Sequence, residues 1–593
     1  FIYKAKKEII SRIYFFASII VPLLIFSIAY IGLAVSNFLY IEKNFFLNGI
    51  GKYMYGLILF PVGVYIILLL KKETYNNLIK KIVYLFSGVL ILVIFFISII
   101  NVNTSSLFDM QNIVSHANPI FYPISQVLSG KTLLVNLTSQ YGLYPIFLEP
   151  VFKIVGLSIL SVTSVMGLLL GLSFLFIFLF LHRIIKNKII LLLGFSTIVV
   201  YLLDGSANPY PYFQYWPIRT LFPCLFLFLS SIYFKGKNKI LYYVLFIISA
   251  LSILWNFDSG VMVFISWVLV LMYMEVFNTS KKVMITKIIR HIINGLVSIA
   301  FISAGYWIYS FLRSGQLPGL SLFFQYQKLF YEGFMMIAMP FPHAWILVVF
   351  IFLVGLLLSI KKWLIKDHDW KNVSIFFLSI LGIGLFSYYE GRSHDATFYL
   401  PLYLPIILLT IFADSIYSII ISNTKLYGHR LLFLMIIFFM LSSPLSLVYK
   451  SGGYYKWSSI GLSSFFEKSE TSLTRNVDFI KNNTDEGEEV FILAKAFDGV
   501  FYGESHTRSV LDIPSFTEVF FKREADYIVD FLKCNKTSKV FVYPFSEFYT
   551  QSGNDIVDIR INQTIKDFYM VMNTSSEDMV LLLNNSDKLE YCK

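Results

Sequence analysis

The sequence has few charged residues and almost no cysteine. Only 14% of its 593 residues are Asp, Glu, Lys or Arg, whereas soluble domains contain about a quarter. Hydrophobic residues make up 57% and aromatic residues 18% of the chain, and the mean hydropathy is +0.70. With 3 Cys, neither a disulfide scaffold nor a paired-cysteine metal site can be built. This composition excludes a water-soluble globular enzyme and predicts a polytopic membrane protein.

Several motifs of soluble enzymes are also missing. The chain contains no GxxxxGK[ST], no HExxH, no GxSxG and no GxGxxG before a helix. ATP-driven chemistry is therefore not supported by this chain. No cofactor is required by the sequence, although a divalent cation such as Mg or Mn stays open.

Apolar runs of spanning length fill the first three quarters of the chain. A bilayer core needs about 20 apolar residues per helix, so 189–203 and 220–234 are the weakest candidates. We predict a mainly α, polytopic bundle of 13 transmembrane helices. The runs lie near 13–36, 53–70, 82–101, 155–181, 189–203, 220–234, 240–255, 260–277, 292–312, 345–360, 373–388, 398–421 and 431–448.

Charge divides the chain and orients it. Residues 1–450, the predicted membrane domain, carry a net charge of +19, and residues 451–593 carry −7. If the N-terminus is cytoplasmic, 24 of the 33 Lys and Arg residues of the membrane part fall on the inner side, as the positive-inside rule requires. The net charge of +12 thus reflects topology and not nucleic-acid binding. We expect an integral plasma or inner membrane protein with an extracytoplasmic C-terminus.

The remaining polar residues gather in loops on the predicted outer face. Loops 102–150 and 313–344 are much longer than a turn requires, which favours a shared site over simple helix ends. The loops are 102–150, 204–219, the short WNFDSG segment around Asp258, 313–344 and 388–399.

Two kinds of charged residue in these loops suggest chemistry. Asp109 follows a spanning run closely and could deprotonate an acceptor hydroxyl, although a helix cap or solvated loop residue is its ordinary alternative. Arg219 and Arg392 could grip a phosphate or snorkel towards lipid headgroups. His394 could donate to the same phosphate. Further site candidates are His116, Gln140, Tyr141, Glu149, Asp258, Lys328, His343 and Glu390; among them, a helix junction is favoured for Glu149 and helix capping for Asp258.

This arrangement resembles the GT-C glycosyltransferases, including aminoarabinose transferases and protein mannosyltransferases. The layout of spanning runs matches over essentially the whole chain, and the SQYGLYP, YWPIRTLFP and YYEGRSH segments resemble family segments. The resemblance implies a polyprenyl-phosphate-linked sugar donor, Asp109 as the catalytic base, and Arg219, Arg392 and His394 near the donor phosphate. Asp109 lies in the second outer loop, whereas the catalytic loop of the family is usually the first. The second acidic residue that several subfamilies have next to or near the catalytic one is missing here.

The implied reaction is an inverting transfer on the extracytoplasmic face. Asp109 would take the proton from an acceptor hydroxyl as it attacks the anomeric carbon, and the arginines would stabilise the departing lipid phosphate. Expected partners are the bilayer, the lipid-linked donor and a glycan, glycolipid or protein acceptor of the cell envelope. The alternatives are a lipid-carrier-dependent oligosaccharide ligase or polymerase, and a transporter or lipid flippase. A transporter would need charged residues inside its helices, and Asp414 is the only carboxylate well inside a run.

Residues 451–593 form a predicted small α/β domain. Short apolar runs such as EEVFILA and KVFVYPF alternate there with amphipathic segments such as ADYIVDFLK, a pattern of strands and helices. The domain could contact acceptors, as the resemblance implies, or act as a packing lid. It holds five N-x-[ST] sequons, beginning at Asn482, Asn535, Asn562, Asn573 and Asn584, and its Cys534 and Cys592 could pair.

Overall fold

The protein is described by a computed structural model. It describes residues 81, 84–85, 87–88, 111–205, 213–276, 281–365, 367, 369–422, 428–441, 472–494, 497–535, 538–544 and 556–584. The predicted spans 13–36 and 53–70 and nearly all of 82–101 lie outside these ranges.

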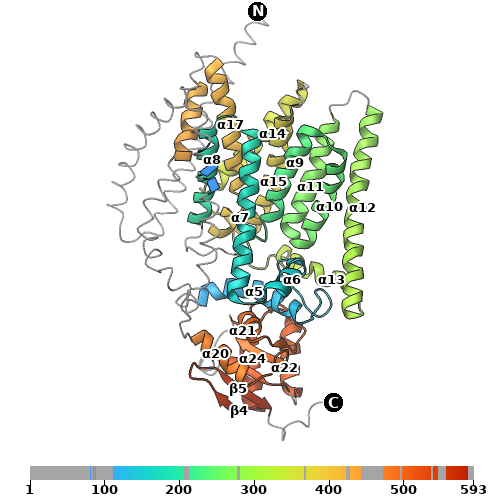
Figure 1. Cartoon of the computed structure of the whole chain (residues 1–593), viewed down its shortest axis with the longest axis vertical. Coiled ribbons are helices and arrows are strands. Elements are labelled where there is room, and N and C mark those ends of the chain that lie inside the picture. Colours follow the sequence, from blue (N-terminus) through green and yellow to red (C-terminus); the bar gives the residue numbers. More distant parts are fainter. Residues whose placement is uncertain are drawn as a thin grey trace, which may run out of the picture.

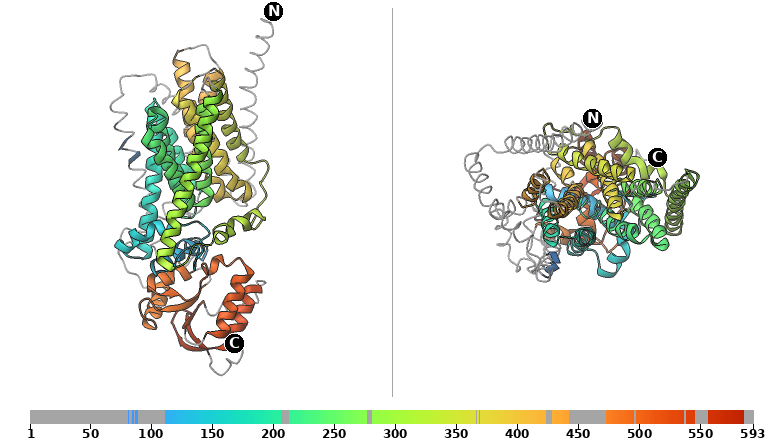
Figure 2. Two further views of the ribbon diagram at one scale, coloured as in Figure 1. Left: turned by 90° about the vertical axis from the view of Figure 1, so that its right-hand side faces the viewer. Right: turned by 90° about the horizontal axis from the view of Figure 1, so that it is seen from above.

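A bundle of apolar helices stands on a smaller α/β unit (Figure 1). In chain order the bundle helices run up and down between two ends, and a second view shows the same two tiers (Figure 2). The helices are α7 (Ile159–Ile184), α8 (Lys188–Gly205), α9 (Leu221–Gly236), α10 (Lys239–Trp255), α11 (Phe257–Glu275), α12 (Lys281–Ser314), α14 (Trp345–Leu364), α15 (Trp370–Gly391), α17 (Tyr403–Ser422) and Gly428–Leu441.

The fold class predicted from the sequence is confirmed. Six described helices are long and apolar enough to cross a membrane, and four shorter apolar helices accompany them. These helices coincide with the ten predicted runs from 155–181 onwards. The total of 13 spans stays a prediction, because the first three runs lie outside the described ranges.

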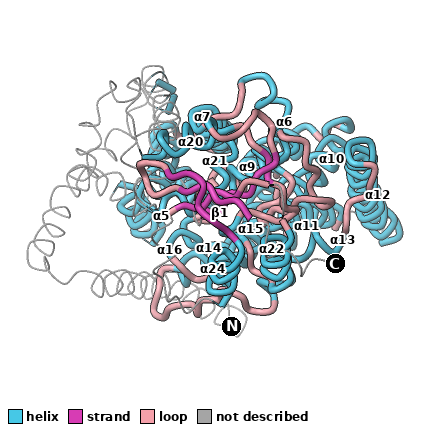
Figure 3. The backbone as a smooth tube through the Cα atoms, turned by 90° about the horizontal axis from the view of Figure 1, so that it is seen from below, coloured by secondary structure: helices cyan, strands magenta, loops and turns pink. Residues whose placement is uncertain are grey.

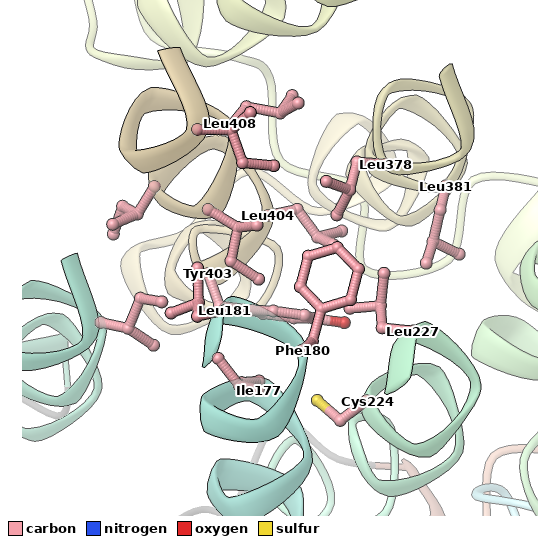
Figure 4. Close-up of a cluster of buried hydrophobic side chains, with 14 of the residues drawn as sticks. Ile177, Phe180, Leu181, Cys224, Leu227, Leu378, Leu381, Tyr403, Leu404 and Leu408 are labelled. Atoms are coloured by element: carbon pink, nitrogen blue, oxygen red, sulfur yellow. The ribbon is translucent and has the colours of Figure 1, made fainter. Parts of the chain in front are cut away.

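Interlocking aliphatic and aromatic side chains hold the bundle together. Figure 4 shows Phe180 of α7, Leu227 of α9 and Leu404 of α17 meeting in one cluster, and each of them is fully buried. Cys224 lies in the same cluster as a free, buried thiol. In lipid, such close packing must supply what the hydrophobic effect supplies in water.

Asp414, the one carboxylate predicted to lie well inside a spanning run, has a structural role. Its two side-chain oxygens accept the backbone N–H groups of Lys186 and Asn187 at 3.0 and 2.9 Å. These groups lie in the turn between α7 and α8. Asp414 therefore closes a helix junction, which is a structural use of a buried carboxylate.

Short helices cover the end of the bundle that faces the α/β unit. They come from the segments predicted as outer loops: α5 (Gln111–Leu128), α6 (Tyr144–Val155), α13 (Leu320–Tyr331) and α16 (Asp395–Tyr399). The described parts of three of the five predicted outer segments, 102–150, 313–344 and 388–399, thus supply helices at this end of the molecule.

The C-terminal unit, residues 472–584, is built on a five-stranded sheet of order β2-β1-β3-β5-β4. Strand β1 pairs in parallel with β2 and β3, and β5 pairs antiparallel with β3 and β4. The elements are α20 (Ser472–Asn482), β1 (Glu489–Ala494), α21 (Asp498–Ser505), β2 (Arg508–Ser509), η2 (Phe516–Glu518), α22 (Lys522–Cys534), β3 (Val540–Tyr543), α24 (Ile556–Phe568), β4 (Tyr569–Thr574) and β5 (Val580–Asn584).

Strand β1 is buried on both faces, and its side chains divide between two cores. Val490 and Ile492 pack with α20 and α21 in a core that continues into α5 and α6. Phe491 and Leu493 pack with α22 and α24 in a second core confined to the unit. The alternation follows from the two-residue period of a strand. Seen from below, the sheet lies across the end of the bundle (Figure 3).

Buried polar contacts join the C-terminal unit to α5. The Asn118 amide donates to Asp498 and, at 2.7 Å, to Ser515 Oγ. Its oxygen accepts the Gly499 backbone N–H at 2.6 Å. A Cβ at Gly499 would come within 2.6 Å of the Tyr122 backbone nitrogen, so only glycine permits this approach of α21 to α5.

A buried lysine makes a second connection. Lys131 is 1% exposed, and its ammonium donates to the Leu511 carbonyl and to Asp512 Oδ1, 3.2 Å away. The two tiers therefore share one polar and apolar interface.

Cys534, at the end of α22, is disulfide-bonded, and Cys592 lies outside the described residues.

We expect Asn118→Ala to loosen this interface. The variant leaves Asp498 and the Gly499 N–H without their buried partner, which costs about 1–3 kcal/mol. Limited proteolysis of the purified protein in detergent should release a C-terminal fragment sooner than in the wild type. Asn573→Ala, at an exposed position on β4, should digest like the wild type. Equal digestion of all three proteins would contradict a role for Asn118 in docking.

Candidate functional site

A cavity of about 300 Å³ lies where the bundle meets the interfacial helices. Residues of α11, α13 and α15 form most of its wall. Its apolar side includes Phe257, Met262, Phe330 and Leu385. Pockets for small ligands begin at about this size and combine apolar walls with a few polar groups. Its polar and charged lining residues are Gln140, Arg219, Asp258, Ser259, Tyr326, Gln327, Ser387, Tyr388 and Arg392.

Arg219 is buried at the cavity wall by aromatic rings. Its guanidinium carbon lies 4.3 Å from the ring centroid of Tyr388, 5.2 Å from Tyr141 and 5.5 Å from Tyr215. One terminal nitrogen donates to the Gln214 carbonyl at 2.7 Å and the other to Asp258 Oδ2 at 2.8 Å. A guanidinium is suited to this mixture of π-stacking and hydrogen bonding. Arg219 therefore supplies positive charge to the cavity while both terminal nitrogens are occupied.

The SQYGLYP segment reaches the cavity through a close backbone contact. Gly142 has φ +105°, and a Cβ there would lie 2.3 Å from the Trp255 carbonyl oxygen. The Asn256 amide donates to the Tyr141 carbonyl at 2.9 Å, and the Leu143 N–H donates to the Leu254 carbonyl at 2.8 Å. Glycine at 142 thus allows the turn between α10 and α11 to hold Tyr141 against Arg219.

Arg392 is positioned differently. It follows α15 directly, and its backbone forms a parallel bridge with Ile337 of the 313–344 segment. The next residue, Ser393, donates its N–H to the Ile337 carbonyl at 3.3 Å. Among the acidic side chains that the structure describes, none forms an ion pair with the Arg392 guanidinium. Of the two arginines that line the cavity, Arg392 is therefore the one without an ion-pair partner among the described side chains.

The structure thus brings together Gln140, Tyr141, Arg219, Asp258 and Arg392 among the residues predicted from the sequence. The capping role expected for Asp258 is wrong, because Asn256 caps α11 by accepting the Ser259 N–H at 3.0 Å. The side chain of Asp258 is instead paired with Arg219.

His394 and His343 lie outside the residues that line the cavity. His394 Nε2 is 3.5 Å from the Tyr215 hydroxyl, so it contacts the aromatic cage behind Arg219. His343 is buried, stacks on Tyr389 and accepts the Trp345 N–H at 3.2 Å. Both are placed to support the wall that carries Arg392 and Tyr388.

Glu149 belongs to another cluster. It lies within α6, where its carboxylate accepts Arg313 Nη1 at 2.6 Å, the Tyr309 hydroxyl at 2.8 Å and Lys153 Nζ at 2.9 Å. This cluster ties α6 to the end of α12.

Lys328 and Glu390 are exposed. Lys328 lies 3.8 Å from Glu332. Asp109 lies outside the described residues, and for His116 only its place in α5 is described. The catalytic role of Asp109 therefore stays a prediction.

The C-terminal unit contributes aromatic rings to the outside of the cavity wall. Phe520 packs against Phe334, with 5.0 Å between ring centroids, and lies 6.3 Å from Tyr326. Arg523 donates to Gln325 of α13. Sequence reasoning missed Tyr326, Gln327 and Tyr388, because aromatic and amide residues at a membrane surface look like an interfacial belt.

Glu518 is a buried carboxyl in this contact. It is 1% exposed, and neither oxygen forms a well-aligned hydrogen bond with a described residue, although the backbone N–H of Gln140 acts to lower its pKa. Burial, and then the charges of Asp498 and Glu524, raise the pKa of Glu518 well above its usual value. Burial likewise raises the pKa of Asp498 to about 6 and that of Glu524 to about 7. No sequence signal marked these three residues, since burial depends on how the tiers dock.

Among the described residues there is no group of three or more His, Cys, Asp or Glu side chains that could hold a metal ion. Dependence on Mg or Mn stays an open expectation.

Comparisons with known proteins give distant structural likenesses. No family model and no curated protein matches the chain. Two crystal structures of ArnT from Cupriavidus metallidurans are similar: the one bound to undecaprenyl phosphate has 10% identity, 84% of this chain and 97% of that chain covered, and a TM-score of 0.43. The apo form has 9% identity, coverages of 79% and 94%, and a TM-score of 0.40. The Archaeoglobus fulgidus oligosaccharyltransferase has 11% identity, coverages of 80% and 70%, and a TM-score of 0.38.

At TM-scores below 0.5 these likenesses carry no argument about the residues or the activity of this chain.

We expect the three buried carboxyls to make docking of the C-terminal unit sensitive to pH. A carboxyl with a raised folded pKa stabilises the folded state fully below its ordinary pKa, and this contribution is lost as the pH rises through the raised value. The thermal midpoint of the wild type should therefore fall by several degrees between pH 5 and pH 8. Glu518→Gln, which stays neutral, should show a smaller fall.

Glu486→Gln, at an exposed position, is the matched control and should follow the wild type. If Glu518→Gln loses as many degrees as the wild type over this pH range, the buried carboxyl is not what titrates.

Proposed function

We propose that this protein is an inverting glycosyltransferase that moves a sugar from a polyprenyl-phosphate donor to a glycan, glycolipid or protein acceptor. The observation that carries the proposal is the cavity between the helix bundle and the short helices at its end. Two arginines line this cavity, and one of them has no acidic partner among the described side chains. A site for a lipid-linked anion needs positive charge next to apolar walls, and this cavity has both.

The charge of the cavity suits such a donor. Its charged lining residues in the described chain are Arg219, Arg392 and Asp258, a net charge of one positive. A prenyl-phosphate sugar is a phosphodiester with one negative charge. When the bond between the anomeric carbon and the phosphate oxygen breaks, the electron pair stays on the phosphate, whose charge grows towards two negative. Arg392 would stabilise this growing charge more than the charge of the bound donor.

The apolar wall would hold the first prenyl units. Phe257 and Met262 of α11, Phe330 of α13 and Leu385 of α15 line that side. Because α11 and α15 are spanning helices by length and hydropathy, this apolar wall is continuous with the part of the bundle expected to lie in the bilayer. Burial of prenyl carbon there would contribute about 0.8 kcal/mol per methylene at most.

In the proposed reaction an acceptor hydroxyl attacks the anomeric carbon from the face opposite the phosphate. Its proton goes to Asp109, and the prenyl phosphate leaves. The configuration of the anomeric carbon is inverted because one displacement occurs.

We expect Arg392→Ala to lower the transfer rate by about 10²–10³-fold, as does removal of one preformed donor to a growing negative charge. Arg392→Lys should recover part of this loss, because charge returns without the forked geometry. The assay is consumption of a panel of polyprenyl-phosphate sugars by the purified full-length protein. Arg560→Ala, in the C-terminal unit and away from the cavity, is the control and should stay active.

We expect Asp109→Asn to lower transfer by about 10²–10⁴-fold, the range of general-base catalysis, without changing expression or the thermal midpoint. Asp485→Asn, at an exposed position, should stay fully active. An Asp109→Asn protein with wild-type turnover would remove Asp109 from the mechanism. Release of a prenyl diphosphate instead of a monophosphate would favour the oligosaccharide ligase or polymerase alternative.

A further inference from the structure

Asp258 is the one carboxylate among the described residues that line the cavity. It stands second in α11, where a carboxylate usually serves as a cap or interacts with the helix dipole. The cap here is Asn256, whose side-chain oxygen accepts the N–H and, at 2.8 Å, the hydroxyl of Ser259. The end of α11 therefore does not need Asp258 as its cap.

One oxygen of Asp258 is fixed and the carboxylate is still open to the cavity. Oδ2 accepts Arg219 Nη2 at 2.8 Å, while the side chain stays 31% exposed and that of Arg219 is only 3% exposed. Arg219 in turn is held by the Gln214 carbonyl and the rings of Tyr141 and Tyr388. Asp258 is thus anchored through one oxygen on a rigid support.

Asp258 does not neutralise the second arginine. Both Asp258 and Arg392 line the cavity, yet within the described ranges the ion pair of Asp258 is with Arg219. The cavity therefore has a cationic point at Arg392 and a separate anionic point at Asp258. A ligand that suits both must carry an anion and, beside it, hydrogen-bond donors or a positive charge.

We propose that Asp258 is a specificity residue for the donor sugar. It accepts a hydrogen bond from a hydroxyl or ammonium group of the sugar ring and repels a sugar that carries a carboxylate. This inference rests on the proposed function and adds the class of sugar, neutral or amino and not uronic, to it.

The size of the effect follows from the chemistry of a partly buried carboxylate. Hydrogen bonds to charged groups are stronger than neutral ones, and a site built to bind a hydroxyl discriminates strongly against an analogue that cannot donate. A uronate would instead bring two like charges together beside an apolar wall. We expect the wild type to use a uronic acid donor about ten- to a hundred-fold less well than a neutral one.

The test uses three donors with the same short prenyl phosphate, carrying glucose, glucosamine or glucuronic acid. The purified full-length protein and Asp258→Asn are compared for kcat/KM on each donor. Asparagine keeps an oxygen for Arg219 and removes the negative charge. We expect the preference for glucose and glucosamine over glucuronic acid in the wild type to shrink to about three-fold or less in Asp258→Asn.

Two further measurements separate recognition from support of Arg219. If Asp258 only held Arg219, Asp258→Asn would slow all three donors by the same factor and leave their ratios unchanged, which would overturn the inference. Asp258→Glu keeps the charge and should keep the discrimination. Donor binding to the wild type, followed as a shift of the thermal midpoint, should show the same order of the three sugars even where a variant folds poorly.

The inference and the proposed function fail in different ways. Transfer from all three donors at similar wild-type rates, or a preference for glucuronic acid, would overturn the inference and leave the glycosyltransferase. Absence of both binding and turnover with every polyprenyl-phosphate sugar in the panel would overturn the proposed function and the inference with it.

Discussion

The site depends on the burial of one guanidinium. Taking an arginine out of water is costly unless its charge is compensated and its N–H groups are bonded. Arg219 meets most of this demand with Asp258, the Gln214 carbonyl and three tyrosine rings, while its Nε has no hydrogen-bond partner among the described residues. These groups come from three segments distant in sequence, besides its own. Arg219 therefore fixes the relative positions of the SQYGLYP turn, the start of α11 and the end of α15, and the shape of the cavity follows from that.

The C-terminal unit also supports the wall of the cavity. It is joined to α5 by Asn118 and to the segment after α5 by Lys131, and Phe520 packs behind Tyr326 and Phe334, which line the cavity. A lid that only covered the bundle would not need a carboxyl such as Glu518 in its interface, because an unpaired buried carboxyl destabilises packing. Burial raises the pKa of Glu518, so the docked state is expected to lose stability as the pH rises.

Much of the fold could be predicted from the sequence, for physical reasons. Apolar runs of spanning length leave the backbone no choice but helix, and the change in composition near Lys450 marks a segment that folds by burying alternate residues of short strands. The cavity-lining residues Gln140, Arg219, Asp258 and Arg392 could be predicted as site candidates because charged and amide groups are rare in such a chain. The interpretation of Asp258 as a cap failed because Asn256, two residues earlier, also has a capping side chain, and only the structure shows which one accepts the Ser259 N–H.

The sequence could not show which charged side chains already have hydrogen-bond or ion-pair partners in the folded protein. Arg219 and Arg392 look equivalent as residues, since both are arginines in outer segments with aromatic neighbours. The fold distinguishes them: both terminal nitrogens of Arg219 are engaged, whereas Arg392 faces the cavity without an acidic partner in the described chain. An arginine that is already paired contributes a fixed electrostatic field. An arginine that is not paired can bind directly to a ligand anion. In the proposed reaction, Arg219 would contribute a fixed positive field, and Arg392 would bind the phosphate whose negative charge grows as the sugar leaves.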